Sequence, residues 1–91
     1  MIYKIVILPT AEIDLLTLKR NEPQAYKKAM KLIDELQDHP QYGTGHPKPL
    51  SSNRIGQWSR HITHKHRLVY EIKDEIVTVL VLSAYGHYDD K

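Results

Sequence analysis

The spacing of apolar residues changes in the middle of the chain, and this change constrains the fold more than any other feature. Between residues 25 and 36, apolar side chains recur at the three- and four-residue spacing of an amphipathic helix: Ala25, Ala29, Leu32, Ile33 and Leu36. Residues 40–57 then hold three of the four glycines and three of the five prolines, which is typical of a loop. Beyond this loop, short runs rich in β-branched residues indicate strands. The chain therefore predicts helices followed by most of a sheet.

Start and stop signals give approximate bounds for these elements. Thr10 is expected to cap the first helix, and Pro23 lies near the start of the second, which ends before His39. In order, we expect a strand at 2–8, a helix at 11–20, a second helix from 23, at most one short strand near 49–52, and strands at 58–63, 66–72 and 76–83. This order, β-α-α-β-β-β, predicts an α+β fold in which both helices pack on one face of a mainly antiparallel sheet. We expect one domain covering residues 1–91.

The alternation of side chains predicts how the strands at 58–63 and 66–72 pair. Their apolar residues reach one core only if Ile62 lies opposite His66, across a three-residue connection or a bulge. His61 and Arg67 then become direct cross-strand neighbours on the opposite, open face. The same register puts Arg60 on the core face, from which it should emerge at the sheet margin. A two-residue turn, which would pair Arg60 with Arg67 on the open face, splits the apolar sets and ranks second.

Positive charge is concentrated in the middle of the chain. Residues 40–70 contain five Lys and Arg and no Asp or Glu, whereas residues 1–39 are neutral and residues 71–91 carry a net charge of −3. Four of the six histidines also lie there: His46, His61, His64 and His66. Such a segment attracts phosphates or an acidic partner. The alternative is a solvated basic edge that prevents strand pairing between molecules; the mixture of arginine and histidine favours the first interpretation.

Composition excludes several classes of protein. The chain has no cysteine, which excludes disulfide bonds, thiolate catalysis and cysteine-ligated zinc. Its longest apolar run, residues 76–82, is far shorter than the ~20 residues of a membrane span. The first residues lack the layout of a signal peptide, so we expect a soluble cytoplasmic protein. One alternative, a metal site at His61-x-x-His64-x-His66, lacks a nearby carboxylate and is a weak zinc pattern. No cofactor or metal is expected.

Four segments taken together point to a known family. They are GTGHPKPL at 43–50, GQWSRHIT at 56–63, HRLVY at 66–70 and GHY at 86–88. This combination resembles the RelE/YoeB toxins, specifically the Txe/YoeB branch, across most of residues 40–88. The resemblance implies a ribosome-dependent, mRNA-cleaving toxin of a bacterial toxin–antitoxin system. It also implies a small, acidic, partly disordered antitoxin as partner, and in this branch some toxins are dimers.

The resemblance assigns roles to individual residues. Arg67 matches the arginine that stabilises the phosphate, His87 the general acid that protonates the leaving 5′ oxygen, and Tyr88 the tyrosine that helps position the RNA. His61 replaces a second active-site arginine, and Lys48 replaces the glutamate proposed as general base. Three further cations are expected to contact RNA: Arg54, Arg60 and Lys65.

The lysine at position 48 raises a chemical problem. Metal-free cleavage by the 2′-hydroxyl needs a base, an acid and cations that stabilise the phosphorane. A lysine with an ordinary pKa of ~10.4 is protonated at neutral pH and cannot accept a proton. His61 beside Arg67 is the better base and would form a two-histidine acid–base pair with His87. The sequence leaves two alternatives open: a binding module for antitoxin or RNA without catalysis, and, less favoured, an RNase that needs no ribosome.

Overall fold

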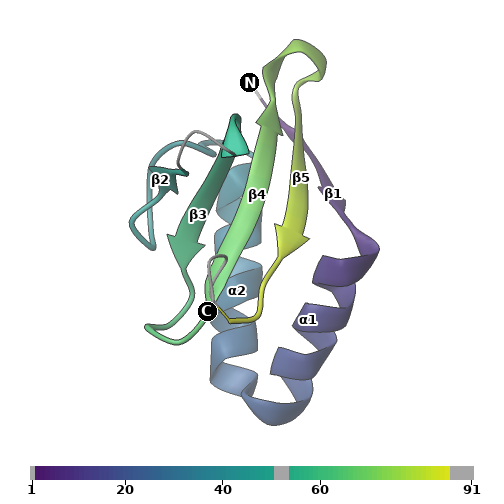
Figure 1. The fold of residues 1–91 in the computed structure, drawn as a ribbon, viewed down its shortest axis with the longest axis vertical. Helices are drawn as coiled ribbons and strands as arrows, with labels where there is room; N and C mark the ends of the chain where they lie inside the picture. Colours follow the sequence, from purple (N-terminus) through teal and green to yellow (C-terminus); the bar gives the residue numbers. More distant parts are fainter. Residues whose placement is uncertain (1, 51–53, 87–91) are drawn as a thin grey trace.

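The computed structural model describes residues 2–50 and 54–86. Its elements, in order, are β1 (Lys4–Ile7), α1 (Pro9–Asn21), α2 (Pro23–Leu36), β2 (Lys48–Pro49), β3 (Gln57–His61), β4 (Arg67–Lys73), the short 3-10 helix η2 (Asp74–Ile76) and β5 (Thr78–Ser83). The strands form one sheet in the order β1-β5-β4-β3-β2, with β1 parallel to β5 and all other neighbours antiparallel (Figure 1). The predicted α+β class is confirmed, and the parallel pair makes the sheet mixed.

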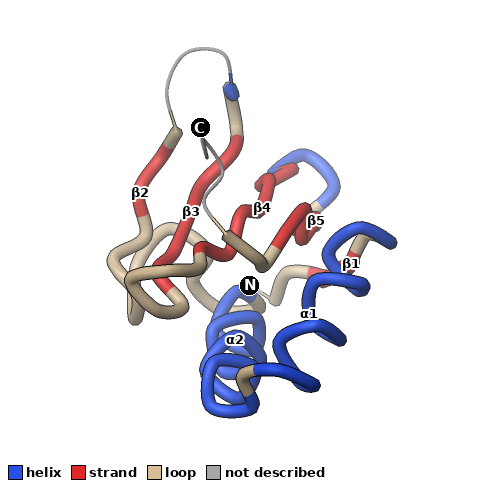
Figure 2. The backbone as a smooth tube through the Cα atoms, turned by 60° about the horizontal axis from the view of Figure 1, so that its bottom comes forward, coloured by secondary structure: helices blue, strands red, loops and turns tan. Residues whose placement is uncertain are grey.

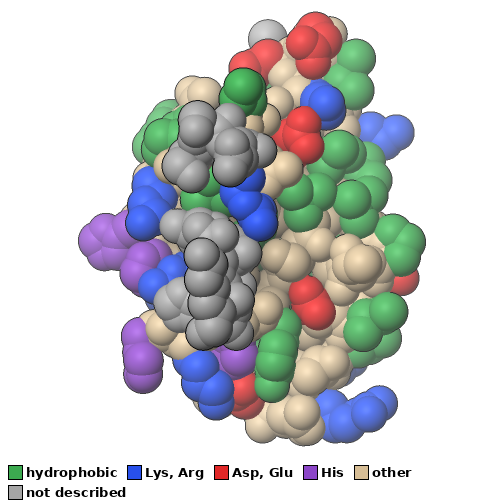
Figure 3. All heavy atoms as spheres, viewed as in Figure 1, with side chains coloured by type: hydrophobic (Ala, Val, Ile, Leu, Met, Phe, Trp, Pro, Cys, Tyr) green, Lys and Arg blue, Asp and Glu red, His purple; other side chains and the backbone are tan. Residues whose placement is uncertain are grey.

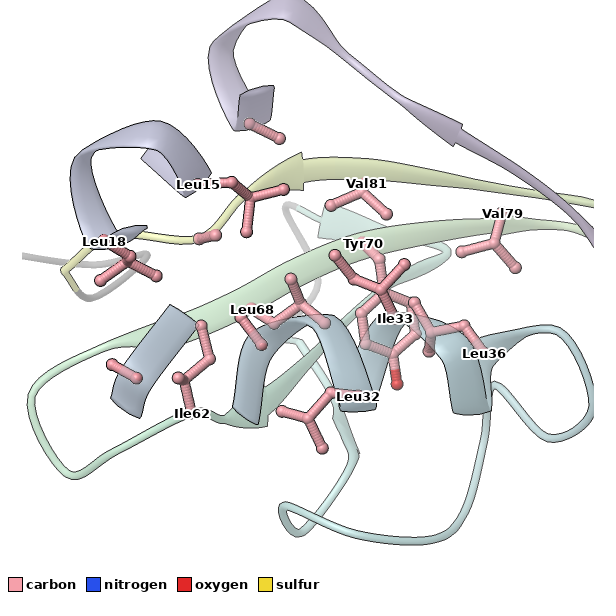
Figure 4. Close-up of a cluster of buried hydrophobic side chains, with 14 residues drawn as sticks. Leu15, Leu18, Leu32, Ile33, Leu36, Ile62, Leu68, Tyr70, Val79 and Val81 are labelled. Atoms are coloured by element: carbon pink, nitrogen blue, oxygen red, sulfur yellow. The ribbon is translucent and has the colours of Figure 1, made fainter. Parts of the chain in front are cut away.

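Both helices lie on the same side of the sheet, α1 near β1 and β5 and α2 beneath β4 and β3 (Figure 2). Every apolar position that predicted the second helix is buried in the core, as are Ala11, Leu15 and Leu18 of α1. These side chains meet Ile62, Leu68, Tyr70, Val79 and Val81 from the sheet (Figure 4). Neither α1 nor α2, the α-helices of the described ranges, is long and apolar enough to span a membrane.

Thr10 does not cap α1, contrary to the prediction. The N-cap residue is Leu8, without a side-chain hydrogen bond, and Pro9 occupies the first turn, where its fixed φ and missing N–H carry no penalty. The Thr10 hydroxyl instead donates to the carbonyl of Leu82 at 2.9 Å. The helix start is therefore tied to β5.

The predicted register between β3 and β4 is confirmed. Trp58 pairs with Tyr70 and His61 with Arg67, and the amides of Ile62 and Thr63 both donate to the carbonyl of His66. β5 is an inner strand between β1 and β4, and its Val79 and Val81 are fully buried. The predicted start of this strand is wrong, because Ile76 lies in η2 and is 64% exposed.

Arg60 does not emerge at the sheet margin; it is fully buried, with 0% of its surface exposed. Its Nη1 donates to Glu35 at 2.8 Å and its Nε to the Tyr70 hydroxyl at 3.2 Å. Nη2 donates to the carbonyls of His39 and Tyr42 at 2.6 and 2.9 Å. These acceptors, which satisfy the guanidinium in the interior, come from α2, the following loop and β4. The prediction that Arg60 contacts RNA is therefore wrong.

Glu35 is held as a carboxylate by the same network. Partial burial by itself would raise its pKa, but hydrogen bonds from Thr44 and Arg60 outweigh burial and lower the pKa below its usual value. The Thr44 hydroxyl and amide donate to the two carboxylate oxygens at 2.7 and 3.1 Å. The carboxylate thus joins α2, the loop and β3.

Replacing the buried arginine tests this network. We expect Arg60→Met to lower the free energy of unfolding by about 3–5 kcal/mol, because it removes the positive charge beside Glu35 and the hydrogen bonds that Arg60 donates to the carbonyls of His39 and Tyr42. Urea unfolding measures the loss. The control is Lys65→Met, which removes a side chain that is 65% exposed and should cost at most about 0.5 kcal/mol. Similar losses in the two variants would contradict the assignment.

The lowered pKa of Glu35 also predicts a dependence on pH. A carboxyl group whose pKa is lower in the folded than in the unfolded state stabilises the fold above its unfolded pKa. That contribution is lost as pH falls through the folded value. We expect the natural chain to lose more stability than Glu35→Gln between neutral pH and pH values below the ordinary glutamate pKa of ~4.3. Urea unfolding at several pH values measures the difference; parallel pH profiles would contradict it.

Candidate functional site

His61 and Arg67 stand opposite each other where β3 ends and β4 begins, on the face of the sheet that does not carry the helices. Both side chains are half-buried. Nη1 of Arg67 donates to the carbonyls of Thr63 and His64 at 3.1 and 3.3 Å, which fixes the guanidinium at the turn between the strands. The sequence-predicted pairing of a histidine with an arginine on this face is therefore present.

Lys48 belongs to the same face. It lies on the short strand β2 and pairs with Ser59 of β3. Because side chains alternate along a strand, Ser59 and His61 share a face. Lys48 is exposed, but Ser59 and Val69 are 0% and 2% exposed, so this face is less open than the alternation predicts. Both are short side chains on strands with a neighbour on either side.

His46 joins the site although sequence reasoning missed it. Its ring meets the ring of His61 edge to face, with the centroids 5.8 Å apart. The loop carries it there because Gly45, with a φ of +87°, brings its carbonyl oxygen within 2.6 Å of the His61 amide. His46 itself has a φ of +53°, a conformation that non-glycine residues rarely adopt. The Gly-x-Gly-His sequence before β2 is the feature from which the position of His46 could have been predicted.

The other predicted cations do not all gather here. Lys65 is exposed in the turn before Arg67, with its Nζ 3.7 Å from Glu22. Arg54 precedes β3 and bonds Gln57 at 3.0 Å; the length of β3, roughly 13 Å, separates this position from His61. Basic and histidine side chains are seen together over the β2–β3 side of the molecule (Figure 3).

His87 and Tyr88 lie outside the described residues, so their predicted roles stay predictions. The described chain leads toward Arg67 as far as Gly86. The Arg67 amide donates to the carbonyl of Gly86 at 2.9 Å. His87 follows Gly86 directly in the sequence.

The alternative zinc pattern is not formed. His66 is 1% exposed, and its two ring nitrogens contact Glu22 and the amide of Gly86. Within residues 2–50 and 54–86, no cluster of three or more His, Cys, Asp or Glu residues could hold a metal ion. Both ring nitrogens of His66 are therefore used in contacts to Glu22 and Gly86.

Comparison with known proteins shows which family the chain belongs to. The model of the YoeB-like toxin of bacterial type II toxin–antitoxin systems matches residues 9–88. The chain belongs to this toxin family. The resemblance drawn from the four sequence segments is confirmed.

Relatives of this family share both sequence and fold with the chain. Toxin YoeB of Synechocystis sp. is 39% identical over 75 residues, which are 82% of this chain and 85% of the relative. The YoeB/ParE toxin from Agrobacterium tumefaciens has a TM-score of 0.86 at 30% identity, covering 93% of this chain and 99% of that one. A chain of the heterotetrameric YoeB–YefM toxin–antitoxin complex from Staphylococcus aureus has a TM-score of 0.79 at 32% identity, covering 94% and 98%.

The approach of the Gly45 loop to β3 is testable. Gly45 and Gly56 both have positive φ, +87° and +81°, so alanine at either position pays the left-handed penalty of about 1–2 kcal/mol. A Cβ at 45 would also lie 2.9 Å from the His61 carbonyl oxygen, whereas the nearest atom to one at 56 is 3.9 Å away. We expect Gly45→Ala to lower the urea midpoint more than Gly56→Ala. Equal shifts would contradict the close approach.

Proposed function

We propose that this chain is an endoribonuclease that cleaves mRNA on the ribosome and thereby stops translation. The observation that carries the proposal is the pairing of His61 with Arg67 beside Gly86, the residue before His87. This arrangement brings an imidazole and a guanidinium side by side on one basic face, and the backbone of Arg67 is hydrogen-bonded to Gly86. Membership of a toxin family gives the substrate class, since the RelE/YoeB toxins act as ribonucleases.

The reaction is a transphosphorylation within the RNA. The 2′ oxygen attacks the adjacent phosphorus while the bond from phosphorus to the 5′ oxygen breaks. The proton of the 2′-hydroxyl passes to the base, for which we propose His61, and the 5′ oxygen receives a proton from the acid, for which we propose His87. The products are a 2′,3′-cyclic phosphate and a 5′-hydroxyl. Each proton transfer contributes about 10²–10⁴-fold to the rate.

Cations stabilise the charge that develops on the phosphorane. A guanidinium has five N–H donors in a planar fork, so Arg67 can bond the turn carbonyls through Nη1 and a phosphate through its other nitrogens. Lys48, exposed on β2, adds a second positive charge on the same face. Tyr88 is proposed to position the RNA beside them, and Lys65 and Arg54 to contact its backbone.

The positive charges on this face also indicate which kind of protein partner the chain binds. The Staphylococcus aureus structure is a toxin–antitoxin complex, and we infer that this chain also pairs with a cognate antitoxin. An acidic, partly disordered segment of such a partner fits the basic face formed by Lys48, Lys65 and Arg67. Occupation of that face would exclude RNA.

Cleavage of ribosome-bound mRNA tests the proposal. We expect Arg67→Ala to slow cleavage by about 10²–10³-fold through lost transition-state stabilisation, and His61→Ala and His87→Ala by about 10²–10⁴-fold each. The control is Lys73→Ala, which removes a positive charge from the other end of β4, roughly 20 Å away. Mapping the 5′ ends of mRNA on arrested ribosomes measures the reaction. Undiminished cleavage by Arg67→Ala would overturn the proposal.

A second candidate is a non-catalytic module that binds the antitoxin or RNA, favoured by the lysine at position 48 where the resemblance implies a glutamate. A positively charged side chain cannot remove the 2′ proton. Comparison of the natural chain with Lys48→Glu separates the two functions. Cleavage by the natural chain supports the nuclease; cleavage by Lys48→Glu alone supports a toxin that has lost activity.

A further inference from the structure

His66 is a buried histidine that the proposed chemistry does not use. Its ring is 1% exposed, yet both nitrogens are engaged: Nε2 lies 2.8 Å from a carboxylate oxygen of Glu22, and Nδ1 lies 2.9 Å from the amide nitrogen of Gly86. A carboxylate only accepts and a backbone N–H only donates. The two partners therefore fix the neutral tautomer that carries its proton on Nε2.

Glu22 is a rigid support for this ring. It is the single residue between α1 and α2, and its amide donates to Leu18 at 2.7 Å while its carbonyl accepts from Tyr26 at 3.0 Å. The hydrogen bond from His66 is the largest cause that lowers the pKa of the Glu22 carboxyl. The helix junction thus presents an ionised carboxylate that orients the imidazole.

Gly86 is held from two sides. Its amide donates to His66 and its carbonyl accepts from the Arg67 amide, so adjacent residues at the start of β4 fix both polar groups of one glycine. The ring of Tyr85 packs on His66 with a centroid distance of 4.5 Å. Gly86 has a φ of +71°, in the left-handed region that favours glycine. The two bonds therefore fix the backbone of Gly86 at the start of β4.

We propose that neutral His66, oriented by Glu22, is a positioning residue of the active site that holds Gly86 against Arg67 and so fixes where the segment bearing His87 begins. This inference rests on the proposed function for the role of His87. His66 touches neither substrate nor the reacting atoms. It acts through the backbone that precedes the general acid.

The arrangement depends on the protonation state of the ring. The groups that face His66 are Glu22 from the helix junction and Tyr85 from the C-terminal segment, with Lys65 of its own turn 3.7 Å from Glu22. A second proton would go to Nδ1, which would then point a donor at the N–H of Gly86. Protonation therefore keeps the bond to Glu22 and removes the one to Gly86.

Two amide variants test the contacts of the two ring nitrogens of His66 one at a time. In His66→Asn the side-chain oxygen takes the place of Nδ1 and can accept from Gly86, whereas in His66→Gln the side-chain amide takes the place of Nε2 and can donate to Glu22. We expect His66→Asn to stay within about threefold of the natural cleavage rate constant, and His66→Gln to fall by about tenfold or more. Hydrogen exchange of the Gly86 amide should accelerate by about tenfold or more only in His66→Gln.

The cleavage rate and the hydrogen exchange of Gly86 together distinguish failure of this inference from failure of the proposed nuclease function. A purely structural role predicts similar losses in both variants, and equal Gly86 exchange or equal cleavage in His66→Asn and His66→Gln would overturn the inference. If Gly86 exchange follows the expected pattern but no variant and not even the natural chain cleaves mRNA, the proposed nuclease function fails while the hold on Gly86 stands.

Discussion

The rest of the structure depends on the hydrogen bonds and the ion pair that the buried guanidinium of Arg60 makes. An unpaired charge in the interior would be far too costly, so the fold has to supply acceptors on every side. They come from the end of α2, from the loop after it and from β4. Because the loop must bring its carbonyls to this point, its course is set before β2 begins. The placement of the basic face therefore follows from an ion pair inside the protein.

The geometry of the site is mostly backbone geometry. The β3–β4 register places His61 beside Arg67, the short ladder to β2 brings Lys48 to the same face, and the Arg67 amide receives Gly86. Each functional group is thus attached to a main-chain hydrogen bond within one or two residues. Sites built on strands in this way are better ordered than sites built on long loops.

The sequence could predict whatever depends on local periodicity. The helix positions 25–36 follow from three- and four-residue spacing. The pairing of His61 with Arg67 follows from side-chain alternation and from the need to join two apolar sets in one core. The fate of Arg60 could not be predicted, because its carboxylate partner lies 25 residues earlier on another element. His66 was missed for the same reason, since its partners Glu22 and Gly86 lie 44 and 20 residues away. Long-range polar contacts leave no periodic signal.

Burial of Arg60 also changes the electrostatic footprint that a nucleic acid would meet. Of the five basic residues in the acid-free segment, Lys48, Arg54, Lys65 and Arg67 are left to face phosphates, since Glu35 neutralises the fifth inside the protein. Each phosphate that a protein neutralises on a single strand releases about 0.7 counterions. The salt dependence that this segment could contribute to association with a nucleic acid is thus limited to at most four phosphate contacts.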